Sequence, residues 1–571
     1  MKSLDEVLED WEAVIGLEVH TELTTLTTKM FCSCKISYGE DANSEVCPVC
    51  LGLPGALPVP NRAAIESIVM AGLATGCQIM PDTMFYRKHY FYPDMTKNFQ
   101  ITQGPVAFCM NGWLDLDVAG KAAEERSHLE GTTALADVFA SYGYDGADET
   151  LRQGYRTRIG ITRIHMEEDA GKLVHIGGTD GRISGSAYSL LDYNRCGVPL
   201  IELVTEPDLR TPEEARLFLQ QLRQIYLALG ISNCSMEEGS LRCDGNISLR
   251  PRGSKTLGTK TELKNMNSFK NLHDGLAYEI CRQAEVLESG GSVRQETRHW
   301  EPATKKTISM RSKETADDYR FFPDPDLAPY HLTEEFVTSV AIRLPELPDA
   351  RKMRYMLDFG LPYPDAVTLA GDSELAVFLD SALAMGGDKG EAAGAGGSGG
   401  VGGGGGGAGA GSVAGAGSVA SVRGDAQNVR LDLARPVANL LLNDVSAWLR
   451  QSASSLSEAP FTPADLAELA GYAQDNTLSS RQVKEVFTEM VESGTRPSVI
   501  VQERGMQLVS DSSAIQTHID AVLAANADKV AEYKSGKTGL KGFFVGQVMR
   551  EMSGQGDPRL ISELIEQQLD S

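Results

Sequence analysis

The chain has 571 residues, of which 42% are hydrophobic, and it carries 53 lysines and arginines against 78 aspartates and glutamates, a formal net charge of −25. A single hydrophobic core seldom organises more than about 250–300 residues, so we expect two or three domains. The negative charge argues against a generic nucleic-acid-binding protein, so any nucleic acid must meet a local basic surface.

The first residues of the chain and its cysteine content bear on where in the cell the protein is expected to be. The first ten residues are acidic and lack the apolar core of a signal peptide, and no apolar run approaches the ~18 residues of a membrane span. We therefore expect a cytoplasmic protein, whose ten cysteines would be thiols or metal ligands rather than disulfides.

Residues 13–23 alternate between apolar and polar side chains, which predicts a strand with one polar face. That face would carry Glu18, His20 and Glu22, and two carboxylates with an imidazole can ligate a cation. Similar groups recur downstream, in His165-Met-Glu-Glu-Asp169, at Glu202 and at Asp244. We infer one acidic site assembled from several strands.

Two close pairs of cysteines follow the first strand, namely Cys32, Cys34, Cys47 and Cys50. Tetrahedral zinc takes four soft ligands, and paired cysteines supply them across a short loop. The alternative is four thiols that only pack in a core. The spacing favours structural zinc, which by itself says little about function.

Glu202 lies in residues 199–204, which otherwise read as a buried strand. An unpaired carboxylate there would be costly, so it needs a metal or a cationic partner. The alternative to a metal is a plain salt bridge, for instance to Arg195.

A helix and a further strand come next. Thr211-Pro-Glu-Glu214 is a capping box with proline at the first helical position, and the helix it begins should end at Gly230. Residues 241–250 alternate again, which predicts a strand with one wholly polar face. That face would carry Arg242, Asp244, Asn246, Ser248 and Arg250.

From Pro345 onward the pattern is helical. We expect a strand-rich α+β domain over residues 1–344, a helical domain over 345–459 and a small helical domain over 460–571. The glycine- and alanine-rich tract 386–424 predicts a disordered linker or a tolerated insertion. The last domain carries a cluster of basic side chains, which is either a binding patch or a solvated helix face: Lys534, Lys537, Lys541 and Arg550.

Several long motifs together resemble the B subunit of the aspartyl/glutamyl-tRNA(Asn/Gln) amidotransferase. They extend over nearly the whole chain: Ile15-Gly-Leu-Glu-Val-His20, Lys88-His-Tyr-Phe-Tyr-Pro-Asp94, His165-Met-Glu-Glu-Asp-Ala-Gly-Lys172, Met236-Glu-Glu-Gly-Ser-Leu-Arg-Cys-Asp244, Glu262-Leu-Lys-Asn-Met-Asn-Ser-Phe269, Asp317-Asp-Tyr-Arg-Phe-Phe-Pro323 and Gly542-Phe-Phe-Val-Gly-Gln-Val-Met549. Two segments depart from the family pattern, an apparent insertion at 118–154 and the glycine-rich tract, and both avoid these motifs.

The resemblance implies a reaction and partners. ATP would phosphorylate the side-chain carboxylate of Glu-tRNA(Gln) or Asp-tRNA(Asn), and ammonia from a glutaminase A subunit would displace phosphate to give the amide, within a heterotrimer that includes a C subunit. The supply of ammonia by another chain agrees with the lack of a credible serine or cysteine nucleophile here. The implied fold is a cradle-shaped catalytic domain around an antiparallel sheet, then a helical domain and a YqeY-like tail that touches tRNA.

The resemblance also implies a site. Mg²⁺ would be held at positions that match Glu18, His20, Glu168 and Glu202, with Asp244 close by, because magnesium favours carboxylates and bridges phosphates. Lys88 and Lys172 flank the acidic motifs and are expected phosphate partners. In some members of the family the four cysteines bind zinc.

Two other classes of function compete with this one. The first is a noncatalytic, zinc-stapled scaffold that binds tRNA, in which the acidic strands only pack. The second is a free-standing metallohydrolase, which would turn over substrate without partner subunits.

Overall fold

The computed structural model describes residues 2–120, 123, 131–144, 149–177, 185–312, 319–385, 431–506, 512–535, 537–552, 556 and 558–570. The chain forms two compact units, residues 1–351 and 352–571. The division lies close to the expected boundary at 344/345, while the boundary at 459/460 stays a prediction. Among the described residues, no helix is both long and apolar enough to cross a membrane.

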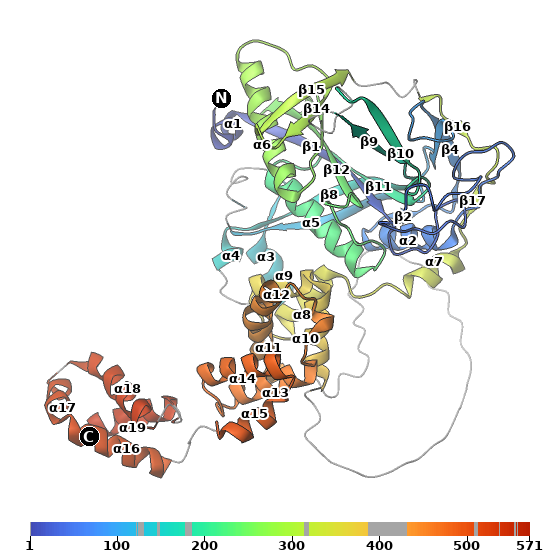
Figure 1. Ribbon diagram of the computed structural model, residues 1–571. Helices are drawn as coiled ribbons and strands as arrows, with labels where there is room; N and C mark the ends of the chain where they lie inside the picture. The colour runs from blue at the N-terminus through green and yellow to red at the C-terminus, as the bar shows by residue number, and fades with distance from the viewer. Residues whose placement is uncertain are drawn as a thin grey trace, which may run out of the picture. The chain divides into compact units, whose positions relative to one another are not determined.

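The first unit is built around one large, mostly antiparallel sheet (Figure 1). Its strand order is β15-β14-β13-β12-β1-β11-β8-β5-β4-β16, and of these pairs only β13 with β14 is parallel among the described residues. These strands are β1 (Trp11–Glu22), β4 (Phe85–His89), β5 (Phe99–Gln103), β8 (Tyr155–Glu168), β11 (Pro199–Thr205), β12 (Leu241–Pro251), β13 (Thr261–Lys264), β14 (Glu296–Glu301), β15 (Lys306–Ser312) and β16 (Phe322–Pro323).

Shorter strands complete the unit. β2 and β7 pair with the long strands β6 and β8, and two small ribbons stand apart from the main sheet. Their bounds are β2 (Gln78–Ile79), β3 (Asp82–Thr83), β6 (Cys109–Val118), β7 (Thr133–Ala134), β9 (Lys172–Ile176), β10 (Tyr188–Asp192) and β17 (Tyr330–His331). The described part of the segment 118–154 contains β7 and two short helices, and Leu135 and Phe139 of this segment are buried.

Helices cover the apolar face of the sheet. The inward side chains of β1, such as Ile15 and Leu17, share one core with apolar residues of α2, α5 and α6. These helices lie against the strands of the sheet (Figure 1). Because alternate residues of a strand face opposite ways, Glu18 and His20 lie on the other face, as predicted. The helices are α1 (Leu4–Asp10), α2 (Arg62–Ala74), α3 (Leu135–Ser141), α4 (Glu149–Arg152), α5 (Pro212–Ala228), α6 (Phe269–Glu288) and α7 (Glu334–Ala341).

The expected helix over 211–230 is α5. Its N-cap Thr211 accepts a hydrogen bond from the backbone N–H of Glu214, and proline occupies its first turn. Gly230 follows the C-cap with φ of +67°, a conformation that favours glycine. The alternation predicted for 241–250 is also confirmed, because Leu241, Cys243 and Leu249 of β12 are buried.

The second unit is helical, as its sequence pattern predicts. Residues 512–570 have a core of their own, which includes Ile519, Phe544 and Ile565. The tract 386–424 lies outside the described residues. The helices are α8 (Pro348–Leu357), which begins in the first unit, α9 (Tyr363–Gly371), α10 (Ser373–Met385), η3 (Leu431–Leu433), α11 (Ala434–Leu440), η4 (Leu441–Val445), α12 (Ser446–Ser452), η5 (Leu456–Glu458), α13 (Pro463–Gln474), α14 (Ser480–Ser493), α15 (Pro497–Arg504), α16 (Ser512–Ala525), α17 (Ala527–Lys534), η6 (Thr538–Leu540), α18 (Lys541–Glu551) and α19 (Pro558–Asp570).

Candidate active site

A row of polar side chains crosses four neighbouring strands on the face opposite the core. In the antiparallel register His20 of β1 lies opposite Glu202 of β11 on one side and Arg242 of β12 on the other, and Glu202 lies opposite His165 of β8. Directly opposite residues share a face, with Cβ atoms about 4.5–5.5 Å apart. We call Arg242, His20, Glu202 and His165 the polar row.

Three side chains at this row form a candidate cation site. One ligand atom from each of His20, Glu167 and Glu202 lies within 4.8 Å of the others. Nε2 of His20 lies 3.1 Å from Oε2 of Glu202, and Nε2 of His165 lies 3.5 Å from that same oxygen and 3.3 Å from Oε1 of Glu167. We call His20, Glu167 and Glu202 the acidic cluster, and its two carboxylates suit a hard cation such as Mg²⁺.

The charged groups of the acidic cluster shift one another's pKa. Burial disfavours the ionised form of Glu202, but the charge of His165 and the hydrogen bond from His20 outweigh burial and hold the pKa of Glu202 well below its usual range. Burial likewise opposes protonation of His20, but the hydrogen bond to Glu202 and the neighbouring carboxylates raise its pKa. Two mostly buried carboxylates, Glu167 and Glu202, therefore stay ionised, and carboxylate oxygens are the ligands that Mg²⁺ prefers.

Lys88 of β4 approaches the acidic cluster from the β8 side. Burial favours its neutral form, but the charges of Glu167 and Glu202 raise its pKa and its own charge lowers the pKa of the buried Glu167. Its Nζ lies 5.3 Å from the centre of the Tyr319 ring, and among the described residues no carboxylate oxygen lies within 4.0 Å of that Nζ. Lys88 is therefore a cation available to phosphate. Lys172, the other expected phosphate partner, is exposed at the start of β9.

Glu18 and Asp244 lie opposite one another, two residues along their strands from His20 and Arg242 of the polar row. Oε1 of Glu18 accepts a hydrogen bond of 3.0 Å from Asn246, and Asp244 forms an ion pair with Lys264. Both acids share the face of His20, but neither belongs to the group of ligand atoms within 4.8 Å. The structure thus places them beside the acidic cluster rather than in it.

Glu168 lies on the other face of the sheet, which corrects the sequence-based assignment of this residue to the cation site. Consecutive residues of β8 point to opposite faces, so Glu168 shares the face of the core residue Met166. Its carboxylate lies 2.5 Å from Nζ of Lys97 and accepts a hydrogen bond of 2.9 Å from the backbone N–H of Ile101. Glu167 takes the place expected for Glu168.

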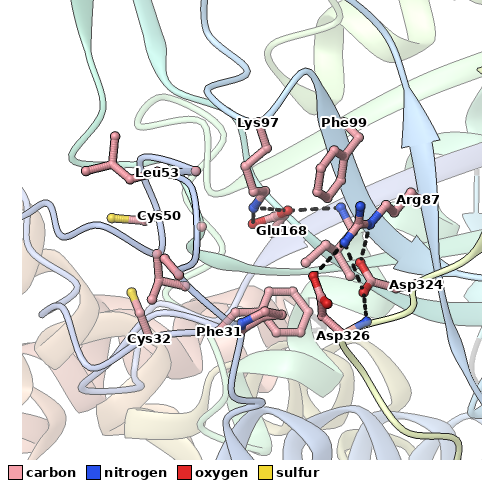
Figure 2. A pocket seen from close by; sticks show the side chains of 16 residues that line it. Phe31, Cys32, Cys50, Leu53, Arg87, Lys97, Phe99, Glu168, Asp324 and Asp326 are labelled. Carbon is pink, nitrogen blue, oxygen red and sulfur yellow. Dashed lines mark hydrogen bonds and ion pairs between the residues drawn. The ribbon is translucent and has the colours of Figure 1, made fainter.

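The ion pair of Lys97 and Glu168 lines a cavity of about 210 Å³, together with Cys50 and Arg87 (Figure 2). Figure 2 shows Arg87 held by two acids, with Nε 2.9 Å from Asp324 and Nη2 2.7 Å from Asp326. The sequence does not predict the role of Lys97, because a single lysine in a turn belongs to no periodic pattern that would place it beside Glu168.

Glu202 has no bond to Arg195, so the salt bridge named as the alternative for it is not formed. Arg195 donates to the backbone carbonyls of Ala170 and Gly171, each at 3.0 Å, and its Nε lies 3.7 Å from Asp169. The nearest ring nitrogens to the carboxylate of Glu202 are instead those of His20 and His165, at 3.1 and 3.5 Å.

The four cysteines of the first loop meet as predicted. One sulfur from each of Cys32, Cys34, Cys47 and Cys50 lies within 4.8 Å of the others. Sγ of Cys50 lies 4.0 Å from that of Cys34 and accepts a hydrogen bond from the backbone N–H of Cys47 at 3.1 Å. A hydrogen bond from Cys32, together with nearby Lys29, lowers the pKa of Cys50 to about 4. Four cysteine sulfurs at this spacing fit tetrahedral zinc.

Replacing Lys97 by methionine should destabilise the first unit by about 3–5 kcal/mol, because the buried Glu168 would lose its only ion-pair partner among the described residues. Denaturant unfolding of the purified chain measures this. The double variant with Lys97→Met and Glu168→Gln should recover a large part of the loss, since no buried charge remains unpaired. Equal destabilisation of the single and double variants would contradict the proposed coupling.

Comparison with known proteins identifies the family. Residues 13–338 match the GatB/GatE catalytic domain and residues 426–569 match the GatB domain. Proteins named as the B subunit of aspartyl/glutamyl-tRNA(Asn/Gln) amidotransferase are similar over nearly their full length: that of Carboxydothermus hydrogenoformans is 42% identical over 98% of this chain and 99% of its own, that of Geobacter sp. (strain M21) is 42% identical over 97% and 98%, and that of Brevibacillus brevis is 40% identical over 99% and 100%.

The matches define one component of an amidotransferase, an enzyme built from several subunits. The chain belongs to the family of aspartyl/glutamyl-tRNA(Asn/Gln) amidotransferase B subunits. The resemblance expected from the sequence motifs is thereby confirmed, and the alternative of a scaffold without catalytic role is not favoured.

Proposed function

We propose that this chain carries the site at which ATP activates the side-chain carboxylate of Glu-tRNA(Gln) or Asp-tRNA(Asn) for amidation, making the complex a carbon–nitrogen ligase. A carboxylate oxygen of the aminoacyl group would attack the γ-phosphorus of ATP, with ADP leaving, and ammonia would then attack the acyl carbon, with phosphate leaving. The observation that carries the proposal is the acidic cluster facing Lys88 on one face of the sheet.

Each part of the cluster has a task in this reaction. His20, Glu167 and Glu202 would hold Mg²⁺, with Glu18 and Asp244 beside them. The cation would supply positive charge that offsets the charge developing during phosphoryl transfer. Lys88 would bind the phosphates of ATP as a point charge, because its ammonium has no carboxylate within 4.0 Å among the described residues. Lys172 stays a weaker candidate for the same task, since it is exposed on β9.

The remaining parts follow from the family. Ammonia would come from a glutaminase A subunit, and a C subunit would complete the heterotrimer, in the cytoplasm where tRNA is charged. The four cysteines would bind structural zinc. The tail, residues 460–571, would contact tRNA through its basic side chains, although two of these are committed to ion pairs: Lys537 lies 3.1 Å from Glu532, and Lys541 contacts Glu566.

The test is an amidation assay on the complex formed with its A and C subunits. We expect conversion of Glu-tRNA(Gln), of Asp-tRNA(Asn) or of both, dependent on ATP and Mg²⁺. Assays with each misacylated tRNA separately identify the substrate. Conversion without ATP, or no conversion by a complex whose glutaminase activity is intact, would overturn the proposal. Turnover by the isolated chain would instead support the metallohydrolase alternative.

A further inference from the structure

Arg242 is held firmly at the end of the polar row. Its Nη2 forms an ion pair with Asp169, whose side chain is buried, and lies 3.7 Å from Oε1 of the equally buried Glu22. Asp169 in turn accepts a hydrogen bond from the backbone N–H of Ala170 at 2.8 Å, and Glu22 accepts one of 2.6 Å from the hydroxyl of Tyr38. The partners that position Arg242 are therefore fixed themselves.

This anchoring uses only part of the guanidinium. Both ion-pair contacts of Arg242 are made by Nη2, and Nε is buried without a hydrogen-bond partner among the described residues. The side chain as a whole is 39% exposed, against 5% for Asp169 and 2% for Glu22. A guanidinium has five N–H donors, and Nη1 of Arg242 has no hydrogen-bond partner among the described residues, so this end of the partly exposed group is left for a ligand. Arg242 thus presents unused donors on the face of the acidic cluster.

The position of Arg242 indicates which anion it binds. Its backbone lies directly opposite His20 on β12, and its guanidinium reaches Asp169 just after β8, whereas Lys88 approaches the acidic cluster from β4. Phosphoryl transfer requires the attacking and leaving oxygens on opposite sides of the phosphorus. If Lys88 and the cation hold the phosphates of ATP, the acceptor carboxylate belongs on the side of Arg242. A planar guanidinium also matches a carboxylate better than an ammonium does.

We propose that Arg242, positioned by Asp169 and Glu22, binds the side-chain carboxylate of the aminoacyl group on tRNA and presents it to the γ-phosphate. This inference rests on the proposed function and adds to it the residue that recognises the acceptor. The exposed donors of the guanidinium would contact the carboxylate oxygens, and the ion pair with Asp169 would keep the group from turning toward the carboxylates of the cluster.

Arg242→Lys in the assembled complex tests the proposal. Lysine keeps the charge but loses the forked donors, so we expect the KM for the misacylated tRNA to rise about 10–100-fold while the KM for ATP stays within about twofold. Asp169→Asn, which loosens Arg242 without removing it, should raise the KM for tRNA by a smaller factor. Unchanged glutaminase activity and an unchanged KM for ATP show that the variant complex is folded.

Arg250→Lys is the matched control. Arg250 lies on the same face of the same strand and is likewise anchored by an acid, Glu12, but it is distant along the strand from the acidic cluster. Its substitution should leave both KM values unchanged. An unaltered KM for tRNA in Arg242→Lys, or a rise only in the KM for ATP, overturns the inference. Failure of the proposed function itself is distinguishable, because the wild-type complex would then form no amide.

Discussion

Replacing Glu202 by glutamine is expected to lower ATP-dependent amide formation by the assembled complex by on the order of 10²–10³-fold. Glutamine has nearly the same shape but removes one of the two carboxylates that, with His20, would hold the cation. The glutaminase activity of the partner chain should persist, because that chemistry occurs outside this protein. The measurement is the initial rate of amidation of Glu-tRNA(Gln) or Asp-tRNA(Asn) at saturating ATP.

Glu206→Gln provides the control for this prediction. Glu206 is an exposed acid just after β11, and its Oε1 accepts a hydrogen bond from Thr162 at 2.6 Å. Its substitution should leave the rate unchanged. If Glu202→Gln retained the wild-type rate, the acidic cluster would be only a packing feature and the scaffold alternative would regain support. Titration with Mn²⁺ as a probe refines the test, since Glu167→Gln should weaken binding, whereas the double variant Lys97→Met with Glu168→Gln, which leaves no buried charge unpaired, should not.

Alternation along the strands is sufficient to predict two polar faces of the site. In β1 and β12 nearly every second residue is apolar, so burial of those residues leaves His20, Asp244 and Arg242 on the opposite face. The same alternation decides which side chains of β8 face the site, although the two consecutive acids Glu167 and Glu168 interrupt the pattern of apolar and polar residues. Ile164 and Met166 are fully buried in the core, so the polar face carries His165 and Glu167. The family resemblance implies Glu168 as a ligand of the cation, whereas the alternation of β8 puts Glu167 on the polar face and Glu168 on the opposite face.

Pairs between distant strands cannot be predicted from the sequence. His20 and His165 reach Glu202 only because β1, β11 and β8 are neighbours in a register that long connections leave open. Lys97 reaches Glu168 from a turn before β5, where no period marks the position. Burial of an acid predicts that a cation must accompany it, but not which one, so the sequence alone leaves Arg195 as a possible partner of Glu202.

Loss of zinc should strongly lower the resistance of the cysteine-containing loop to protease. We expect the purified, reduced chain to contain about one zinc per chain, and Cys50→Ser to release it, because tetrahedral sites need all four ligands. The loop that carries the four cysteines lies between β1 and α2, is described throughout and contains no helix or strand, so apart from a bound metal it is held by individual backbone and side-chain contacts. The buried Lys29 makes two of them, with its Nζ 2.8 Å from the carbonyl of Glu45 and 3.3 Å from that of Tyr193. Residues 27–59 should therefore become sensitive to protease when zinc is removed.

Limited proteolysis with metal analysis checks this, before and after a chelator that removes zinc from the wild-type chain. Chelation and Cys50→Ser should open the same segment, whereas Cys281→Ser, a change in a lone buried thiol of α6, should retain zinc and resistance. Because Cys50 also lines the cavity that contains Glu168 and Lys97, loosening of this loop should expose the buried ion pair to water. Absence of stoichiometric zinc from a folded, reduced sample would reduce the four cysteines to packing residues and would leave the site on the opposite face of the sheet unaffected.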